Sequence, residues 1–324
     1  MPNNVPKQNP VKQKIIEQLA DGHFHSGEEL GELFGISRAA ISKQIKGLQE
    51  WGLDIYKVQG KGYQLSAPMD LLNHQVIQQA STVPVELIPV IGSTNQYLLD
   101  NITELESGSV CVAEYQESGR GRRGRNWLSP YGSNLYFSMY WKLESGVAAA
   151  MGLSLAIGVA IVDALESLGA SGIKLKWPND IYFEDRKLAG VLVEMSAQTG
   201  GEAHIVIGMG LNIHMKEDSN IDQPWASLDQ VFKGKTPNRN DIVIALIRCW
   251  KEVLEQYEVQ GMERYVERWN ALDNFKNKPI KLIMGNREVH GIGKGINDQG
   301  GVLIETDKGI ETYIGGEISL RKAE

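Results

Sequence analysis

The sequence predicts a multidomain α+β protein with an N-terminal winged helix-turn-helix, a central domain around a mixed sheet, and a small C-terminal β-barrel. Three observations lead to this fold class. Residues 11–65 contain three helical patterns followed by a hairpin pattern. Residues 85–272 mix strand and helix patterns without a regular βαβ rhythm. After Pro279, short alternating runs separated by glycine-containing turns are typical of a barrel of about five strands.

The N-terminal region carries the pattern of three short helices. Apolar residues of the first helix recur at helical spacing, at Val11, Ile15, Ile16 and Leu19. Ser26 and Glu29 form a capping box that begins the second helix, and Gly35 ends it. Ser37 is placed to cap a third helix. Two short helices joined by a tight glycine turn are typical of a helix-turn-helix, whose second helix can enter a major groove.

The outward face of the third helix suits DNA, because small residues allow approach to base edges and lysines can reach phosphates. A hairpin with its turn at residues 59–62 follows, in the position of a wing. Residues 36–63 contain five Lys/Arg and two acids, which favours DNA over the alternative of a winged helix used only for protein contacts. The residues expected to bind DNA are Ser37, Arg38, Ala39, Ser42, Lys43, Lys46 and Lys61.

The central region begins after Pro68, which marks a linker. A short helix is expected at 70–80, and the principal helices at 148–168 and 241–258. The expected strands are 85–90, 109–116, 135–141, 173–177, 188–195 and 204–212. These patterns predict a winged-helix DNA-binding domain over residues 1–68, a central α+β domain over 69–275 and a β-barrel over 276–324.

Composition excludes several function classes. The chain has 324 residues and a net charge of −7, which excludes a generally basic nucleic-acid coat, so nucleic-acid contact must be local. Cys111 and Cys249 lie in apolar runs without a CxxC pattern, and predict reduced core thiols and no protein-bound metal. The N-terminus lacks a signal-peptide core, and the apolar run 151–165 is too short to span a bilayer. We therefore expect a cytoplasmic protein without membrane contact.

Residues 119–125 form the most informative motif, with four arginines and three glycines in one stretch. Glycines permit close approach of the backbone to a ligand, and guanidinium groups suit phosphate or carboxylate. An Arg-Gly segment that touches RNA nonspecifically, or a solvated basic turn, is the alternative. The position between two predicted core strands favours a ligand pocket. Charge repulsion predicts a loop that is mobile when empty and ordered by an anion.

Four other segments place polar groups at the ends of apolar runs. They are Ser93-Thr94-Asn95, Gln116, the Lys-Trp-Pro-Asn-Asp stretch at 176–180 and the Arg-Lys-Leu-Ala-Gly stretch at 186–190. Taken singly, each has a structural explanation, such as a helix cap, a solvated turn residue or a charge at a strand end. Their combination indicates one ligand site.

With these motifs, and with Gly210-Leu211-Asn212, essentially the whole chain resembles the bifunctional biotin–protein ligases and biotin-operon repressors of bacteria. Gly92 departs from the pattern, because relatives often carry an acidic residue there. The resemblance implies a class II synthetase-like catalytic domain and an SH3-like barrel. It also implies that biotin and ATP, with Mg²⁺ on the phosphates, form biotinyl-5′-adenylate, and that biotin then passes to a lysine of a biotin carboxyl carrier protein.

The resemblance also implies roles for individual residues. Lys187, Arg122 and Asp180 are expected to be catalytic, with Asp180 orienting or deprotonating the acceptor amine. The residues expected to bind biotin are Ser93, Thr94, Asn95, Gln116, Gly119, Arg120, Gly121, Arg122 and Lys187. Those expected to bind ATP or the adenylate are Arg120, Arg122, Trp127, Asn179, Lys187 and Asn212.

In the family that the chain resembles, the adenylate promotes a homodimer that binds operator DNA and represses biotin-synthesis genes. Two alternatives are a ligase whose winged helix does not repress transcription, and a ligand-sensing transcription factor that has lost catalysis. Lys187 and the arginine loop speak against the second alternative, and the lysines of the third helix against the first. A lipoate–protein ligase would share the broad catalytic fold, but would not combine this loop with this N-terminal domain.

Overall fold

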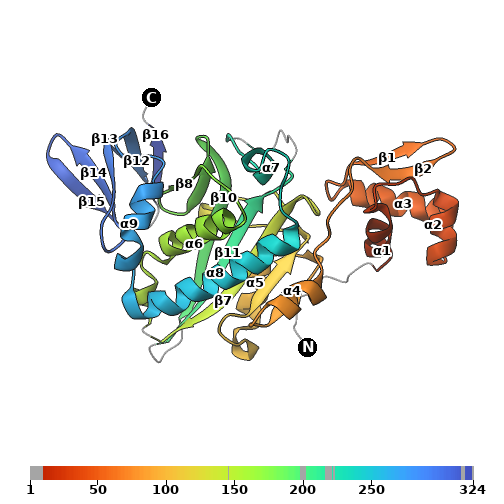
Figure 1. Cartoon of the computed structure of the whole chain (residues 1–324), viewed down its shortest axis with the longest axis horizontal. Coiled ribbons are helices and arrows are strands. Elements are labelled where there is room, and N and C mark those ends of the chain that lie inside the picture. Colours follow the sequence, from red (N-terminus) through yellow and green to blue (C-terminus); the bar gives the residue numbers. More distant parts are fainter. Residues whose placement is uncertain are drawn as a thin grey trace.

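The computed structural model describes residues 10–144, 146–197, 202–215, 221, 223–314 and 318–322. The winged helix (red to orange) lies at one end of the elongated molecule and the C-terminal strands (blue) at the other (Figure 1). The central sheet and its helices lie between them. The fold class predicted from the sequence is confirmed.

The N-terminal region consists of α1 (Pro10–Leu19), α2 (Gly27–Phe34), α3 (Arg38–Gln49) and the wing strands β1 (Ile55–Val58) and β2 (Gly62–Leu65). The predicted caps form as expected. Ser26 and Glu29 make a complete capping box at the start of α2, and Gly35 ends that helix in the left-handed conformation with φ of 67°. Ser37 accepts a hydrogen bond from Ala40 N and thereby caps α3.

The central sheet has seven strands in the order β3-β5-β7-β11-β10-β9-β8. Only the β3–β5 pair is parallel among the described pairs of this sheet. The strands are β3 (Val85–Leu87), β5 (Val110–Ala113), β7 (Asn134–Leu143), β8 (Ile173–Lys176), β9 (Asp180–Phe183), β10 (Arg186–Ala197) and β11 (Ala203–Asn212). The strand β9 was not predicted, because it is short and follows directly on the Trp-Pro turn.

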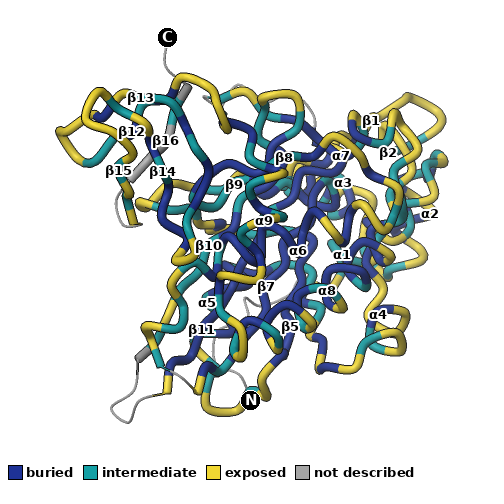
Figure 2. Tube along the Cα trace, turned by 60° about the vertical axis from the view of Figure 1, so that its left-hand side comes forward, coloured by how far each residue is buried: buried dark blue, intermediate teal, exposed yellow. Residues whose placement is uncertain are grey.

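Helices cover both faces of this sheet. One face packs against α6 (Leu153–Ser167) and α8 (Arg239–Gln260) in the largest apolar core, which appears as the dark-blue interior in Figure 2. The other face packs against α5 (Thr94–Asp100) in a smaller core. The predicted helix at 148–168 is interrupted, because Gly152 has a φ of 83° and separates a short 3₁₀ turn, η3 (Val147–Ala150), from α6.

Smaller elements complete the central region. They are α4 (His74–Ala80), η1 (Ile102–Glu104), η2 (Arg122–Gly124), α7 (Leu228–Val231), α9 (Glu263–Leu272), and the parallel pair of β4 (Val90–Ile91) and β6 (Tyr115–Gln116). The predicted strand at 109–116 is therefore divided into β5 and β6. The second part pairs away from the main sheet and leads into the arginine loop.

The C-terminal region is a small antiparallel domain with strand order β15-β14-β13-β12-β16. Its strands are β12 (Pro279–Met284), β13 (Arg287–Ile296), β14 (Val302–Thr306), β15 (Gly309–Tyr313) and β16 (Ile318–Lys322). It meets the central domain where Trp177 Nε1 donates to Gly300 O at 3.0 Å. Among the described residues, no helix is both long and apolar enough to cross a lipid bilayer.

Aromatic and ionic contacts join the winged helix to the central domain. Trp51, just after α3, stacks on Tyr115 and Tyr131 with ring centroids 5.4 and 5.8 Å away.

Beneath the linker, Arg239 lies 2.7 Å from the carboxylate of Glu114, and both side chains are almost fully buried. The same carboxylate accepts a hydrogen bond from Leu72 N, so this ion pair holds the linker against the central domain.

Candidate active site

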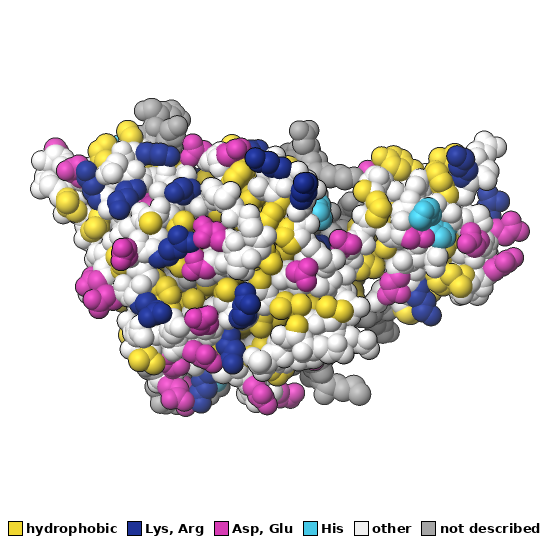
Figure 3. Space-filling view, viewed as in Figure 1, with side chains coloured by type: hydrophobic (Ala, Val, Ile, Leu, Met, Phe, Trp, Pro, Cys, Tyr) yellow, Lys and Arg dark blue, Asp and Glu magenta, His cyan; other side chains and the backbone are white. Residues whose placement is uncertain are grey.

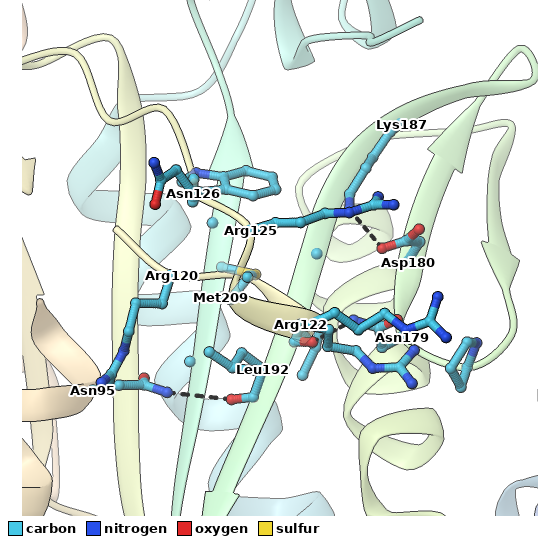
Figure 4. Close-up of a pocket in the computed structure, with 18 of the residues that line it drawn as sticks. Asn95, Arg120, Arg122, Arg125, Asn126, Asn179, Asp180, Lys187, Leu192 and Met209 are labelled. Carbon is cyan, nitrogen blue, oxygen red and sulfur yellow. Dashed lines mark hydrogen bonds and ion pairs between the residues drawn. The ribbon is translucent and has the colours of Figure 1, made fainter. Parts of the chain in front are cut away.

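One pocket brings most of the predicted site residues together on the β10–β11 side of the arginine loop (Figure 4). Side chains from every predicted motif line it: Ser93, Thr94, Asn95, Gln116, Arg120, Gly121, Arg122, Trp127, Asn179, Asp180 and Lys187. Gly119 and Asn212 lie outside this lining. A Cβ at Gly119 would be 2.5 Å from Trp127 O, so its role here is to let the loop pack tightly. Asn212 donates to Ala226 O at 3.1 Å.

The inner end of the pocket is a network of neutral hydrogen-bonding groups. Thr94 N donates to Gln116 Oε1 at 3.0 Å, and Thr94 Oγ1 lies 3.1 Å from the same oxygen. Gln116 Nε2 in turn donates to Ser129 Oγ at 3.2 Å. Ser138 Oγ lies 2.7 Å from Thr94 Oγ1 and 2.6 Å from Asn95 Oδ1. Such a network can offer both donors and acceptors to a small polar ligand.

Ser138 has no predicted role, although it is fully buried at the centre of this network. It lies in the middle of β7, whose other members are mostly large and apolar. A hydroxyl in such a strand is the signal that could have identified it, because buried polar groups need partners.

Side-chain contacts hold the arginine loop against α5, β10 and the Trp-Pro turn. Arg120 donates to Gln96 Oε1 at 2.8 Å and pairs with Glu194 at 2.9 Å. Arg122 donates to Asn179 Oδ1 at 3.1 Å, and its burial lowers the pKa of the guanidinium. Within the loop, Arg123 has a φ of 60°, a conformation that costs energy for a residue other than glycine. The predicted mobility of the empty loop stays a prediction.

Two lysines face one carboxylate at the outer end of the pocket. Lys187 Nζ lies 2.7 Å from Asp180 Oδ1, as the dashed line in Figure 4 marks. Lys176 Nζ lies 3.8 Å from Asp180 Oδ2 and donates to Tyr182 OH at 2.8 Å. Burial lowers the pKa of Lys176 to about 8, against the opposing effect of Asp180. The sequence motif contained Lys176, but only the structure places it in the pocket.

Trp127 lies across the pocket floor on two strands. A Cβ at Gly210 would be 2.2 Å from the indole ring, so this position requires glycine, whereas one at Gly190 would make an ordinary contact with the ring at 3.4 Å. Lys187 Nζ lies 5.4 Å from the ring centroid. Among the described residues, the buried Trp127 Nε1 has no hydrogen-bond partner. This nitrogen faces Gly210, where a Cβ would lie 2.3 Å from it.

The charges of the pocket favour an anionic ligand beside a polar head group. Arg123, Arg125 and, from β16, Arg321 also line it, and the sequence assigned no role to any of these three. No group of three or more His, Cys, Asp or Glu side chains in the described part of the chain is arranged to hold a metal ion. Lysines and arginines supply the positive charge among the residues that line the pocket.

The predicted DNA-binding residues lie on the winged helix. Lys43, Lys46 and Lys61 are exposed, and the exposed hydroxyl of Ser37 is engaged in capping α3. Lys61 Nζ lies 5.4 Å from the ring of Phe24. On the face shown in Figure 3, basic side chains at this end of the molecule stand among acidic ones and histidines. Any contact with DNA on that face would therefore be local.

The chain combines a winged helix with a pocket that suits an anion and a polar head group. This combination indicates an enzyme that carries a DNA-binding domain. The sequence pattern of the Biotin/lipoate A/B protein ligase family matches residues 87–212. Patterns of an HTH domain and of the Biotin protein ligase C terminal domain match residues 11–64 and 276–321.

Whole-chain comparisons agree with these matches. The Bifunctional ligase/repressor BirA of Escherichia coli K12 is 52% identical over 98% of this chain and 99% of its own length. The protein of the same name from Bacillus subtilis is 28% identical over 96% of this chain and 98% of its own. A solved biotin protein ligase from Aquifex aeolicus, in complex with biotin and ATP, aligns with a TM-score of 0.66 at 28% identity, over 74% of this chain and 99% of that one. The chain belongs to the family of bifunctional biotin–protein ligases and repressors.

Proposed function

We propose that this protein is an ATP-dependent biotin–protein ligase that also represses transcription of biotin-synthesis genes. The observation that carries the proposal is the 52% identity to a bifunctional ligase/repressor over both the winged helix and the catalytic region. The pocket supports it, because a neutral hydrogen-bonding end adjoins a strongly cationic end. Biotin has matching parts: a polar ureido head and a carboxylate that must meet a phosphate.

In the activation step, the biotin carboxylate attacks the α-phosphate of ATP, and pyrophosphate leaves as biotinyl-5′-adenylate forms. Two anions must approach each other, so cations fixed in advance lower the barrier. Lys187 and Arg122 are the residues we assign to this task. Asp180 holds Lys187 in place before substrates bind, at 2.7 Å, and Asn179 holds Arg122 at 3.1 Å. Mg²⁺ is proposed to arrive with the nucleotide phosphates.

The neutral network fits the head of biotin. A ureido group presents two N–H donors and one carbonyl acceptor, so it requires both kinds of partner. Thr94, Asn95 and Gln116 supply hydroxyl and amide groups. Thr94 N donates to Gln116, and Ser138 and Ser129 bond to Asn95 and Gln116, so these contacts fix the positions of the three side chains. Trp127, with its buried Nε1–H, is proposed to contact the adenylate.

In the transfer step, the acceptor lysine attacks the biotinyl carbonyl, and AMP leaves. The attacking amine must be neutral, so a base near the mixed anhydride has to accept its proton. We assign Asp180 to this role, because substrate anions would draw Lys187 away from it and free one carboxylate oxygen. Lys176 remains 3.8 Å from the other oxygen. The arginine loop excludes water, which would otherwise hydrolyse the anhydride.

Ligase activity is tested with purified protein, biotin, ATP, Mg²⁺ and a biotin carboxyl carrier domain. The expected result is one biotinyl mass added to the carrier domain, and none without ATP. Omitting Mg²⁺ in the presence of a chelator should stop the reaction. An unmodified carrier domain under all conditions would overturn the proposed activity.

Repression is proposed to need a homodimer that the adenylate promotes, because one winged helix makes few contacts with DNA. Acceptor protein would compete with dimerisation, so transfer of biotin would return the protein to a weak DNA binder. Lys43→Ala and Lys46→Ala should each weaken binding to promoter DNA of biotin-synthesis genes. Each should also reduce the slope of log affinity against log salt concentration by about one. The matched control is Lys14→Ala, an exposed lysine of α1. If dimerisation and DNA binding are both indifferent to the adenylate, the protein is a ligase only.

A further inference from the structure

Glu194 joins two parts of the pocket that are far apart in the sequence. It lies on β10, and its Oε2 atom is 2.9 Å from Arg120 Nη2 in the arginine loop. The same oxygen accepts a hydrogen bond from Asn95 Nδ2 at 2.8 Å, in the first turn of α5. Figure 4 shows Asn95 and Arg120 converging at this edge of the pocket. One carboxylate therefore contacts both the loop and the neutral network.

The contact with Glu194 fixes the orientation of the Asn95 amide. Asn95 Nδ2 also faces Leu192 O at 3.4 Å, so a flipped amide would place its oxygen against two other oxygens. Asn95 Oδ1 must then face Ser138 Oγ, which donates its proton there at 2.6 Å. A hydroxyl has one proton, so Ser138 can only accept in its 2.7 Å contact with Thr94. The carboxylate thus sets the direction of the hydrogen bonds along this chain.

The same carboxylate tethers the loop. Arg120 has two partners, Glu194 and the neutral Gln96; its own side chain is exposed, and that of Glu194 is partly buried. Charge-assisted hydrogen bonds of this length are roughly twice as strong as neutral ones. The tether holds the start of the arginine loop over the head pocket. The rest of the loop is not held by Glu194 and can change conformation when an anion binds at the other end of the pocket.

We propose that Glu194 is a positioning residue that couples closure of the arginine loop to the hydrogen-bond direction of the head pocket. It acts through Arg120 on one side and through Asn95 on the other. The proposal rests on the proposed function, in that the head pocket is taken to bind biotin. Glu194 needs no contact with the reacting atoms, so its removal should be felt mainly in the affinity for biotin.

The first test uses Glu194→Gln, which keeps the size and removes the charge. Stopped-flow tryptophan fluorescence with biotin alone should show dissociation about tenfold faster. In steady-state kinetics, the substitution should mainly raise the KM for biotin. Glu202→Gln is the matched control, because Glu202 makes an ion pair of the same 2.9 Å length with Lys142 outside the pocket. The control should dissociate biotin at the wild-type rate.

A double-mutant cycle tests the coupling. The cycle also uses the single variant Arg120→Gln and the double variant that combines it with Glu194→Gln. Biotin should dissociate from the double variant no faster than from the faster of the two single variants. Gln96→Ala removes only the neutral partner of Arg120 and should have a smaller effect. Fully additive losses, or a Glu194→Gln variant with wild-type biotin dissociation, would overturn the proposal.

Hydrogen exchange on the ligand-free protein separates this proposal from the proposed function. Amides of residues 119–125 should exchange faster in Glu194→Gln and in Arg120→Gln than in wild type. Unchanged exchange in both would refute the tether, whatever the ligand. Wild-type protein that binds no biotin would instead refute the proposed function. If Glu194→Gln does not fold, Glu194→Asp keeps the charge on a shorter stem, and wild-type loop exchange in that variant would count against the proposal.

Discussion

Replacing Lys187 with methionine tests the assignment of the activating cation. The substitution keeps the length of the aliphatic stem and removes the ammonium group, which lies 2.7 Å from Asp180 and is only 16% exposed. During activation this group is expected to exchange Asp180 for the biotin carboxylate and the α-phosphate. Lys187→Met should therefore slow adenylate formation more than it affects folding.

The magnitude follows from the contacts of the site. Removing one preorganised donor from developing charge costs about a hundredfold to a thousandfold in rate, or about 3–4 kcal/mol of the barrier. In the variant, Asp180 keeps Lys176 as a cationic neighbour at 3.8 Å. The carboxylate is not left buried without a cation, so the cost to the free energy of unfolding should be on the order of 1–2 kcal/mol.

Single-turnover release of pyrophosphate, with saturating biotin and ATP, measures the activation step directly. A urea unfolding curve on the same preparation measures stability. Lys174→Met is the matched control, because Lys174 lies on β8, two strands from β10 in the same sheet, and donates to Ala271 O outside the pocket. A folded Lys187→Met variant with a near-normal rate would refute the assignment, and an equal loss in Lys174→Met would show that the effect is not local.

Three further outcomes follow from the structure. Arg122→Gly removes a clamp from the anionic end, so the adenylate should dissociate about tenfold faster in stopped-flow experiments; equal rates would contradict this. Glu114→Gln leaves the Arg239 guanidinium buried without its anion, and denaturant unfolding should show a loss of about 3–5 kcal/mol; a loss below about 1 kcal/mol would count against it. Burial raises the pKa of Asp273 to about 6, above its ordinary value of 3.8, so wild-type stability falls as pH rises through that range. Asp273→Asn should therefore be more stable than wild type at pH 8, by on the order of 1–2 kcal/mol in denaturant unfolding, and about equally stable near pH 4, where the wild-type carboxyl is protonated; a difference that does not depend on pH would exclude this cause.

Sequence alone predicted the elements that local interactions specify. The capping box of Ser26 and Glu29 and the left-handed Gly35 involve neighbours within one helical turn, so the residue types suffice to predict the helix-turn-helix. The arginine loop was recognisable because its composition is extreme and the strands on either side are apolar. The motifs around the arginine loop indicated the family because each places particular residue types at the end of a predicted strand or helix.

Only the tertiary structure decided which distant residues complete the pocket. Ser138 meets Thr94 across 44 positions, and Glu194 meets Arg120 across 74, because sheet register and helix packing bring them together. The buried pair of Arg239 and Glu114 spans 125 positions and joins the linker to the central domain. No local pattern records such contacts, since a serine, a glutamate or an arginine looks the same in a sequence whether it faces water or a partner. Its burial and its neighbours are properties of the folded chain.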